Sequence, residues 1–252
     1  MTTPLALVTG ASRGIGKAIA LKLAHNGFHV LALARTTGAL EALVAEAPKS
    51  SIEPMALDMG DLGHVEKALV TLSAREVGVL VNNAGIAPSS SLAKTTLAEF
   101  QSVQAVNLAA PFLFCRAFMP AMAARGSGRV VNIASTAAFR GYLYTAAYCA
   151  SKHALLGLTR SLALEYAAKK VTINAVCPGW TETDMLSSAV ARIEKKTGRS
   201  AEEAKAAIVG GHPLGRAVSP AEVAEVVAFL ATSPGAAAIN GAAYIVDGAE
   251  SV

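Results

Sequence analysis

The sequence has few charged residues, few aromatic residues and only three cysteines. Charged residues make up 16% of the 252 residues and aromatic residues 5%. The net charge is only +4, and no block of basic residues alternates with aromatic ones, which excludes a typical nucleic-acid-binding surface. With 53% hydrophobic residues, the chain has ample material for a buried core. Its length fits one large α/β domain better than two small ones.

Cysteine pairs, metal-ligand clusters and long apolar runs are also missing. Cys115, Cys149 and Cys177 are odd in number and widely spaced, and no secretory signal precedes them, so we expect free thiols in a reducing cytoplasm. The histidines have no ligand-like spacing with cysteine, and no metal site is expected. No uninterrupted apolar run approaches the ~18 residues of a membrane span, which favours a soluble protein without a membrane partner.

Short apolar runs alternate with segments of helical periodicity along the whole chain. The connections are too long for hairpins, so this alternation predicts a doubly wound parallel sheet with helices on both faces, in a single domain over residues 1–252. The predicted strands are 5–8, 29–34, 52–57, 77–81, 129–133, 171–176 and 243–246. The predicted helices are 15–26, 38–47, 61–74, 97–124, 145–168 and 220–232.

One region, 180–212, departs from this alternation. It is helical in character but interrupted by Thr197 and Gly198, and it follows the predicted strand 171–176. Insertions after the carboxyl end of a strand are where such folds place a cover over the ligand. We therefore expect 180–212 to be a substrate-covering helical insertion; the alternative is an ordinary surface hairpin of two helices.

A glycine-rich turn, TGASRGIG, joins the first predicted strand to the first predicted helix. Glycines allow a tight turn and close approach of the backbone, and the N-terminus of the helix offers unpaired N–H groups to a pyrophosphate. Glycine also serves plain packing of a helix on a strand, so the motif alone is weak; its place in the first βαβ unit favours cofactor binding. The candidate contacts are Gly10, Ser12, Arg13, Gly14, Ile15 and Gly16.

Further motifs follow this turn in a fixed order. The motifs are Asn82-Asn83-Ala84-Gly85, Asn107, Ser135, Tyr148, Lys152, Pro178-Gly179 and Thr183. Together with the turn, they make the sequence resemble the short-chain dehydrogenase/reductase family over nearly its whole length. The resemblance implies a Rossmann-type domain, a bound NAD or NADP, and a catalytic Ser-Tyr-Lys set supported by an asparagine.

The chemistry of that set follows from its residue types. Tyr148 and Lys152 are four residues apart and share a face of a helix. We expect the ammonium of Lys152 to lower the pKa of the phenol from its reference near ~10, which would make it a usable acid and base. Ser135, at the end of a strand, can hydrogen-bond a substrate carbonyl oxygen. By resemblance, Asn107 helps hold a water chain behind the lysine. The alternative for Tyr148 is an interface tyrosine beside a surface lysine.

Other tyrosines test this assignment. Tyr166 and Lys170 repeat the spacing, but they lie at the far end of the helix and no serine ends a strand at a comparable distance before them. Tyr142 and Tyr144 lie near Ser135, but neither has a lysine four residues later. We interpret these three tyrosines as partly exposed aromatic residues.

The end of the second predicted strand bears on the choice of cofactor. An NAD site normally has an acidic residue there, but the sequence reads Ala34-Arg35-Thr36. A guanidinium can bind a 2′-phosphate, and Arg13 could add a second contact. We therefore expect NADP(H), with NAD(H) as the less favoured cofactor; the alternative is that both arginines are merely solvated.

The remaining cofactor positions rest on the resemblance. Asp58, with Met59 beside it, matches the position that binds the adenine amino group; the alternative for Asp58 is a turn or a helix cap. Thr183 would bind the cofactor amide. Further candidate contacts are Asn83, Ala84 and Gly85 on the adenine-ribose side, Tyr148 and Lys152 at the ribose, and Pro178, Gly179 and Thr181 near Thr183.

These residues predict an oxidoreductase that interconverts a ketone and a secondary alcohol. The C-terminal third is similar to that of 3-oxoacyl-carrier-protein and acetoacetyl-CoA reductases, so the expected substrate is a small carbonyl compound, an acyl thioester included. Sugar and other secondary-alcohol dehydrogenases share much of that stretch and remain the alternative. A catalytically silent nucleotide-binding regulator would lack the tyrosine or the lysine, and both are present.

The helical runs 97–124 and 145–168 are apolar on more than one side. A helix that is apolar all round needs partners all round, and an exposed apolar stripe on a soluble protein usually marks an oligomer interface. The family resemblance points the same way. We expect a homotetramer; the alternative is one broad core face with alanine-rich contact to solvent.

Overall fold

Seven strands form one sheet in the computed structural model, which describes residues 3–210 and 213–251. The strands lie in the order β3-β2-β1-β4-β5-β6-β7, and each neighbouring pair is parallel. This confirms the predicted doubly wound sheet. The strands are β1 (Leu5–Thr9), β2 (His29–Ala34), β3 (Ile52–Ala56), β4 (Val77–Asn82), β5 (Gly128–Ile133), β6 (Val171–Pro178) and β7 (Ala243–Val246).

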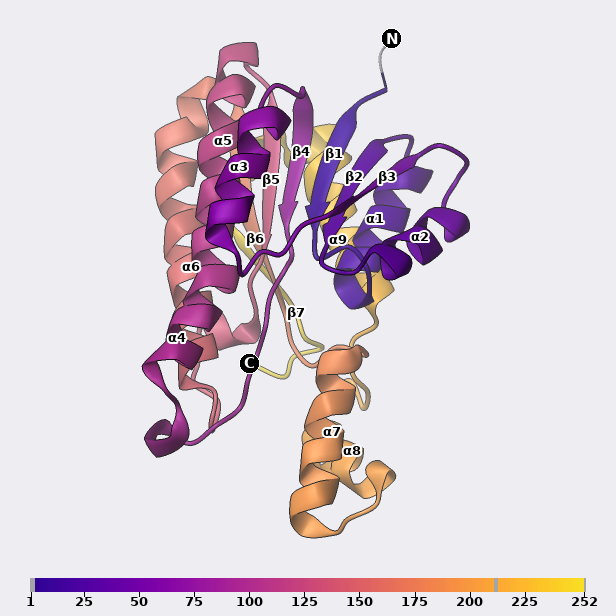
Figure 1. Cartoon of the computed structure of the whole chain (residues 1–252), viewed down its shortest axis with the longest axis vertical. Coiled ribbons are helices and arrows are strands. Elements are labelled where there is room, and N and C mark those ends of the chain that lie inside the picture. The colour runs from indigo at the N-terminus through magenta and orange to yellow at the C-terminus, as the bar shows by residue number, and fades with distance from the viewer. Residues whose placement is uncertain (1–2, 211–212, 252) are drawn as a thin grey trace.

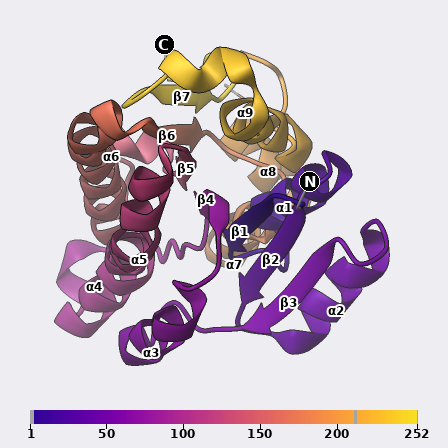
Figure 2. The same ribbon diagram turned by 90° about the horizontal axis from the view of Figure 1, so that it is seen from above.

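Helices cover both faces of the sheet. Figures 1 and 2 show α1, α2 and α9 on one side and α3, α5 and α6 on the other. The helices are α1 (Gly14–His25), α2 (Thr37–Glu46), α3 (Leu62–Leu72), α4 (Leu97–Gln104), α5 (Ala110–Arg125), α6 (Ala146–Tyr166), α7 (Asp184–Thr197), α8 (Ala201–Val209) and α9 (Pro220–Thr232).

The central strands are apolar on both sides because both faces of the sheet are covered. In β1, Ala6 and Val8 pack with α1 and α9, whereas Leu7 between them packs with α3 and α5. In β2, Leu31 and Leu33 share the side of Leu7. Successive side chains of a strand point to opposite faces, so a strand between two helical layers needs no polar side.

The predicted helix 97–124 is one long, interrupted helix. Between α4 and α5, residues Ala105–Ala109 form a π-helical segment. The whole stretch Leu97–Arg125 is long and apolar enough to span a membrane by length and composition alone, with a mean hydropathy of 1.4. However, 56% of its most apolar window is buried inside the protein, and Phe114 and Phe118 pack in the core beneath the sheet. It is the core helix of this fold.

The region 180–210 forms two paired helices, α7 and α8, that extend from the edge where the strands end (Figure 1). Leu186 and Val190 of α7 pack against Ala204 and Val209 of α8. Among the described contacts between α7 and the body, Arg13 pairs with Asp184 at 2.9 Å, and the Lys196 ammonium lies 5.7 Å from the Tyr144 ring centroid. Residues 211 and 212 of the predicted insertion lie outside the described part of the chain.

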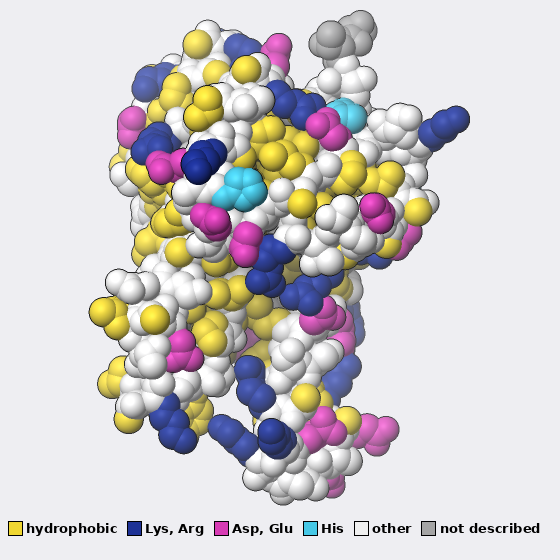
Figure 3. All heavy atoms as spheres, viewed as in Figure 1, with side chains coloured by type: hydrophobic (Ala, Val, Ile, Leu, Met, Phe, Trp, Pro, Cys, Tyr) yellow, Lys and Arg dark blue, Asp and Glu magenta, His cyan; other side chains and the backbone are white. Residues whose placement is uncertain are grey.

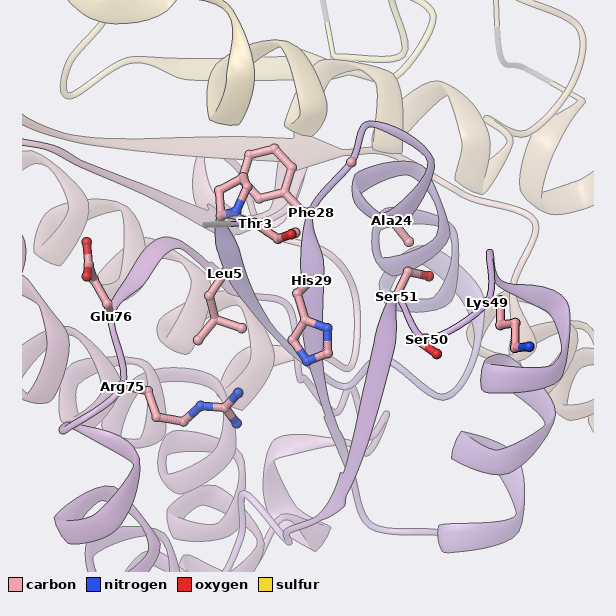
Figure 4. A pocket seen from close by; sticks show the side chains of 12 residues that line it. Thr3, Leu5, Ala24, Phe28, His29, Lys49, Ser50, Ser51, Arg75 and Glu76 are labelled. Atoms are coloured by element: carbon pink, nitrogen blue, oxygen red, sulfur yellow. The ribbon is translucent and has the colours of Figure 1, made fainter. Parts of the chain in front are cut away.

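A groove of about 660 Å³ lies at the opposite edge of the sheet, where the strands begin. Figure 4 shows it beside Leu5 and His29, the first residues of β1 and β2. Next to it, Glu53 accepts two hydrogen bonds from Arg75, both of 2.8 Å. Ligands of doubly wound folds bind at the carboxyl ends of the strands, so this groove is not the expected cofactor site.

Candidate active site

The glycine-rich turn leaves the N-terminus of α1 open. Gly10 and Gly14 have φ values of +66° and +53°, which favour glycine. No side chain of the described residues caps α1, and its first turn has no acidic residue. By contrast, α4, α8 and α9 each begin with a complete capping box. The free N–H groups of α1 therefore fit an anionic group such as a pyrophosphate.

Gly16 allows the turn to pack against the end of β4. A Cβ atom on Gly16 would lie 2.1 Å from the carbonyl oxygen of Gly10 and 2.3 Å from Asn83 Nδ2. That amide donates hydrogen bonds to the carbonyl oxygens of Thr9 (2.9 Å) and Gly10 (3.1 Å). Gly16 and Asn83 thus hold the turn in shape. Around them Ser12 is half-buried, Ile15 packs on the core, and Ala84 packs beneath the sheet.

The two arginines predicted to select NADP are both exposed. Arg35 follows the last residue of β2. Arg13 precedes α1 and pairs with Asp184, with both side chains about two-thirds exposed (68% and 67%). An exposed ion pair stabilises a protein by only ~0–1 kcal/mol. Arg13 can therefore leave Asp184 and pair with a bound phosphate with little loss of stability.

Asp58 and Met59 follow β3 and differ in their surroundings. Asp58 is exposed, and its Oδ1 accepts a hydrogen bond from the Gly60 N–H at 2.9 Å, which forms the turn expected as the alternative. The helix cap itself is Asp61, which accepts from the His64 N–H. The Met59 side chain is buried in the core, so only its backbone is open to a cofactor.

Ser135, Tyr148 and Lys152 come together at the carboxyl edge of the sheet. Ser135 follows β5 and hydrogen-bonds the Tyr148 side chain, which α6 provides from its first turn. Lys152 is 4% exposed, and its ammonium lies 5.7 Å from the Tyr148 ring centroid and donates to the Ile133 carbonyl oxygen at 2.7 Å. The hydroxyls of Ser135 and Tyr148 and the ammonium of Lys152 therefore face one site.

The pKa of Tyr148 is raised, whereas the sequence predicted that it would be lowered. Burial raises the pKa of Tyr148 to about 12, and the hydrogen bond with Ser135 only partly offsets this. Burial also lowers the pKa of Lys152 to about 8. The prediction that the pKa of the phenol is lowered was wrong for the protein alone, because desolvation by burial is the largest influence on the pKa of both Tyr148 and Lys152. At neutral pH, Tyr148 is protonated and suited to donate a proton.

Asn107 lies in the π-helical segment and is fully buried. Its Oδ1 accepts from the Ile86 N–H (2.9 Å), and its Nδ2 donates to the Ile86 carbonyl oxygen (2.9 Å) and to Ser151 Oγ (3.0 Å). A Cβ atom on Gly85 would lie 3.4 Å from Asn107 Oδ1 and 3.6 Å from Lys152 Nζ. Asn107 is thus on the lysine side of the site, as the resemblance implies, and π-helical turns often occur at functional sites.

The segment after β6 closes the site next to the glycine-rich turn. Thr181 is buried, and its hydroxyl donates to the Gly179 carbonyl oxygen at 3.1 Å. Thr183 is the N-cap residue of α7, and its methyl carbon would lie 3.1 Å from a Cβ atom on Gly14. Pro178 ends β6, so all four predicted positions lie at the edge that holds the catalytic set.

Comparison with known families decides the identity of the fold. Residues 4–194 match the family model described as short chain dehydrogenase. The chain belongs to this family. The seven-stranded sheet, the glycine-rich turn and the Ser-Tyr-Lys set together are what the sequence resemblance implied.

Relatives of this dehydrogenase family match over nearly the full chain. A 3-oxoacyl-[acyl-carrier-protein] reductase of Synechocystis sp. is 38% identical, with 98% of this chain and 97% of that protein covered. A 2-(R)-hydroxypropyl-CoM dehydrogenase of Xanthobacter autotrophicus is 37% identical, with 97% of each chain covered. The crystal structure of a variant of actinorhodin polyketide ketoreductase with NADPH superimposes with a TM-score of 0.91 at 38% identity, covering 98% of this chain and 96% of that one.

Sequence reasoning missed a polar cluster beside the catalytic set of this family member. Tyr142, interpreted from the sequence as a partly exposed aromatic residue, is half-buried, and its hydroxyl contacts Arg140, Thr136 and Glu250. The only sign of this cluster in the sequence was that Tyr142 is close to Ser135, because Glu250 is 108 residues from Tyr142 along the chain. Tyr144 is 58% exposed, as expected.

Proposed function

We propose that this protein is an NADP(H)-dependent ketoreductase. The observation that carries the proposal is the hydrogen-bonded pair of Ser135 and Tyr148, beside the buried Lys152 and at the same sheet edge as the uncapped N-terminus of α1. The NADPH bound to the polyketide ketoreductase that superimposes on this chain supports the choice of cofactor.

Each catalytic residue has a role that follows from its surroundings. Ser135 donates a hydrogen bond to the carbonyl oxygen of the substrate and polarises it. Bound NADPH supplies the hydride to the carbonyl carbon. Tyr148 gives its phenolic proton to the oxygen that becomes the alcohol, and the raised pKa keeps that proton available at neutral pH. Lys152 contributes a positive charge behind the phenol, and Asn107 fixes the segment around it.

The surroundings of the site favour an acyl thioester as substrate. Apolar side chains are exposed on the loop between Ser135 and Tyr148 and on α7: Phe139, Leu143, Tyr144 and Met185. Figure 3, viewed as Figure 1, shows a hollow between the part of the molecule that carries α4 and the part that carries α7, with Lys and Arg side chains on its borders. An acyl chain on an anionic carrier fits apolar and basic surroundings better than a sugar does.

A substrate panel tests the proposed function. Turnover of β-ketoacyl thioesters, diketones and keto-sugars would be followed by the decrease of NADPH absorbance. We expect the highest kcat/KM with β-ketoacyl thioesters. Preference for a sugar would support the alternative of a sugar dehydrogenase, and no turnover with any carbonyl compound would support a silent nucleotide-binding regulator.

We also propose that residues 180–212 cover the bound substrate. Within the described part of this segment, α7 and α8 pack on each other and on Ala217 in one apolar cluster. The helix α7 also contacts the body through the exposed Arg13–Asp184 pair and through Lys196 on Tyr144. A pair of helices packed mainly on each other can move as a unit about its attachment to the body.

Replacing Arg35 by Asp is expected to shift cofactor preference from NADP towards NAD. The substitution removes a cation that can pair with the 2′-phosphate and adds a carboxylate that repels it and can accept the ribose hydroxyls. Loss of one charge-assisted hydrogen bond costs ~1.5–3 kcal/mol, so kcat/KM for NADPH should fall roughly 10- to 100-fold. Steady-state kinetics with both cofactors measure the shift. A wild-type enzyme that prefers NADH would contradict the assignment of Arg35.

We further propose that the protein is a homotetramer. The predicted helices 97–124 and 145–168 have apolar residues on all sides. Many of these residues lie in the core, but Phe100, Phe112 and Leu164 are exposed. A second apolar patch comes from Phe229 of α9 and Ile245 of β7, the edge strand of the sheet. Two separate self-complementary patches on one chain generate a tetramer with two-fold axes.

Light scattering tests the assembly. We expect a mass about four times the 25.7 kDa of the chain. Phe112→Glu should reduce the assembly to dimers, because it buries an unpaired charge in one of the two interfaces. Val70→Glu is the matched control, since Val70 is 78% exposed on α3, outside both patches. A wild-type mass near that of one chain would rule the tetramer out.

We propose the cytoplasm as the location. Cys115, Cys149 and Cys177 are all buried free thiols, and the nearest hydrogen-bond partners of two of them are Asn82 and Thr145 rather than another cysteine. Free thiols are typical of reducing compartments.

A further inference from the structure

Arg13 lies in the glycine-rich turn, next to the end of β2. It is the N-cap residue of α1. The Ala11 N–H of the same turn donates to the Leu33 carbonyl oxygen at 3.0 Å, which places the turn beside the end of β2, where Arg35 follows. In doubly wound folds, the ribose of the adenosine half of the cofactor is recognised at the end of this strand. The turn that carries Arg13 is therefore next to the place where NADPH has its 2′-phosphate and NADH has a hydroxyl.

The Arg13 guanidinium is paired with a carboxylate of α7. Its Nη1 donates to Oδ2 of Asp184 at 2.9 Å, and the two residues are 171 positions apart in the sequence. In the first turns of the two helices as the structure describes them, α7 has Asp184 as its acidic residue and α1 has none. The turn before α1 is thus suited to bind an anion, yet the cation within it is already neutralised by a carboxylate.

The backbone around Asp184 holds its carboxylate next to the turn. The preceding residue, Thr183, packs on the turn, since a Cβ atom on Gly14 would lie 3.1 Å from the Thr183 methyl carbon. The segment that leads to α7 is also fixed, because the Glu182 N–H donates to the Val218 carbonyl oxygen at 2.9 Å. The short side chain of Asp184 therefore faces Arg13 because the fold places its backbone there.

A phosphate that binds Arg13 must compete with the Asp184 carboxylate. Both side chains are about two-thirds exposed (68% and 67%), so solvent screens the pair and its contribution is small. The 2′-phosphate of NADPH can overcome such a pair, but the affinity for NADPH is reduced by the strength of the pair. NADH has a hydroxyl in place of this phosphate and leaves the pair intact, so its affinity is not reduced.

We propose that Asp184 is a determinant of cofactor specificity: its carboxylate pairs with Arg13 in the absence of a 2′-phosphate and thereby lowers the affinity for NADPH but not for NADH. The proposal rests on the proposed function, in which NADPH is the cofactor. Specificity is the difference between two binding free energies, so a residue that weakens the binding of one cofactor alone changes it. The chain therefore discriminates between the two cofactors less strongly than its two arginines alone would.

Asp184→Asn tests the proposal, because asparagine has nearly the same shape as aspartate and no charge. Isothermal titration calorimetry of the full chain with NADPH and with NADH measures both dissociation constants, at low ionic strength, where exposed charges are least screened. The strength of an exposed pair corresponds to a factor of roughly two to five in an equilibrium constant. We expect Kd for NADPH to fall by this factor and Kd for NADH to stay the same. Asp184→Ser is a second uncharged variant and should give the same result.

A double-mutant cycle separates an effect through Arg13 from direct repulsion between Asp184 and the phosphate. Arg13→Gln should weaken the binding of NADPH, and adding Asp184→Asn to it should then have little effect, because there is no guanidinium for the carboxylate to hold. The matched control is Glu225→Gln, which removes the carboxylate from another ion pair of α1, that of Lys22 in its last turn with Glu225 of α9. It should leave both dissociation constants unchanged.

A gain in affinity for NADPH alone that depends on Arg13 supports the proposal. An equal gain for both cofactors, a gain of the same size in the absence of Arg13, or no gain in either uncharged variant of Asp184 overturns it. Failure of the proposed function is detected separately in the wild-type protein: if it binds NADH more tightly than NADPH, the assignment of the cofactor is wrong, whatever the variants of Asp184 show.

Discussion

Replacing Tyr148 by Phe is expected to lower kcat for carbonyl reduction by ~100-fold or more, with NADPH affinity close to that of wild type. The variant keeps the ring, which lies 5.7 Å from Lys152 Nζ, and removes only the hydroxyl. That hydroxyl is hydrogen-bonded to Ser135 and stays protonated at neutral pH, because burial raises the pKa of Tyr148 to about 12. Without it, the oxygen that receives negative charge during hydride transfer has no proton donor.

The decrease of NADPH absorbance measures kcat, and the fluorescence of Trp180, the one tryptophan of the chain, reports NADPH binding. Tyr166→Phe is the control, since it repeats the spacing to a lysine four residues later. Lys170 lies beyond the end of α6, however, and the ring of Tyr166 is instead approached by Lys169 at 4.3 Å. Near-wild-type turnover of Tyr148→Phe would remove Tyr148 as the donor.

The arrangement of strands and helices was predictable because local sequence decides it. A strand covered on both faces must be apolar throughout, so β2 begins and ends where its apolar run does. The edge strand β7 also has its predicted bounds, although its Ile245 is exposed. The helix α9 also agrees with its predicted bounds, since Ser219 and Glu222 form its capping box and Pro220 begins it. The anion-binding N-terminus of α1 was also predictable, because the glycine-rich turn that precedes it is a local feature of the sequence.

The interruption of the helix at Ala105–Ala109 could not be predicted. Its periodicity continues through the segment, and the amide of Asn107 is held by Ile86 and Ser151, which come from other parts of the chain. Contacts between distant residues, rather than helix propensity, decide such a π-helical turn. The resemblance to the family identified Asn107, but no local pattern showed why it is buried.

The pKa of Tyr148 was mispredicted for a similar reason. Spacing along a helix shows that Tyr148 and Lys152 are neighbours, but it does not show how far each side chain is removed from solvent. Desolvation depends on the surrounding side chains from β5, β6 and the loop after Ser135, and here it dominates both pKa values. The contacts of Glu250 with Arg140 and Tyr142 were missed for the same reason, because they join residues that are far apart in the sequence.

Replacing Gly16 by Ala is expected to lower kcat/KM for NADPH by ~100-fold, because it displaces the turn that would hold the pyrophosphate. The added Cβ would lie 2.1 Å from the Gly10 carbonyl oxygen and 2.3 Å from Asn83 Nδ2. Contacts this short must lengthen by about one ångström, and packed interiors do not absorb such shifts locally. The Asn83 amide would lose its bonds to Thr9 and Gly10, and the free N–H groups of α1 would no longer converge on one point.

The substitution should also destabilise the fold, by ~1–3 kcal/mol as for other overpacked cores, which lowers the melting temperature by about 2–4 °C per kcal/mol. Gly38→Ala is the matched control, because Gly38 lies in α2 with nothing within 4 Å of an added Cβ. It should keep full activity and a melting temperature at or slightly above that of wild type, since alanine favours helices. The two effects of Gly16→Ala are separable: assays well below its melting temperature show whether the folded variant binds NADPH. Unchanged kcat/KM for NADPH in the folded variant would mean that the cofactor does not bind at the glycine-rich turn.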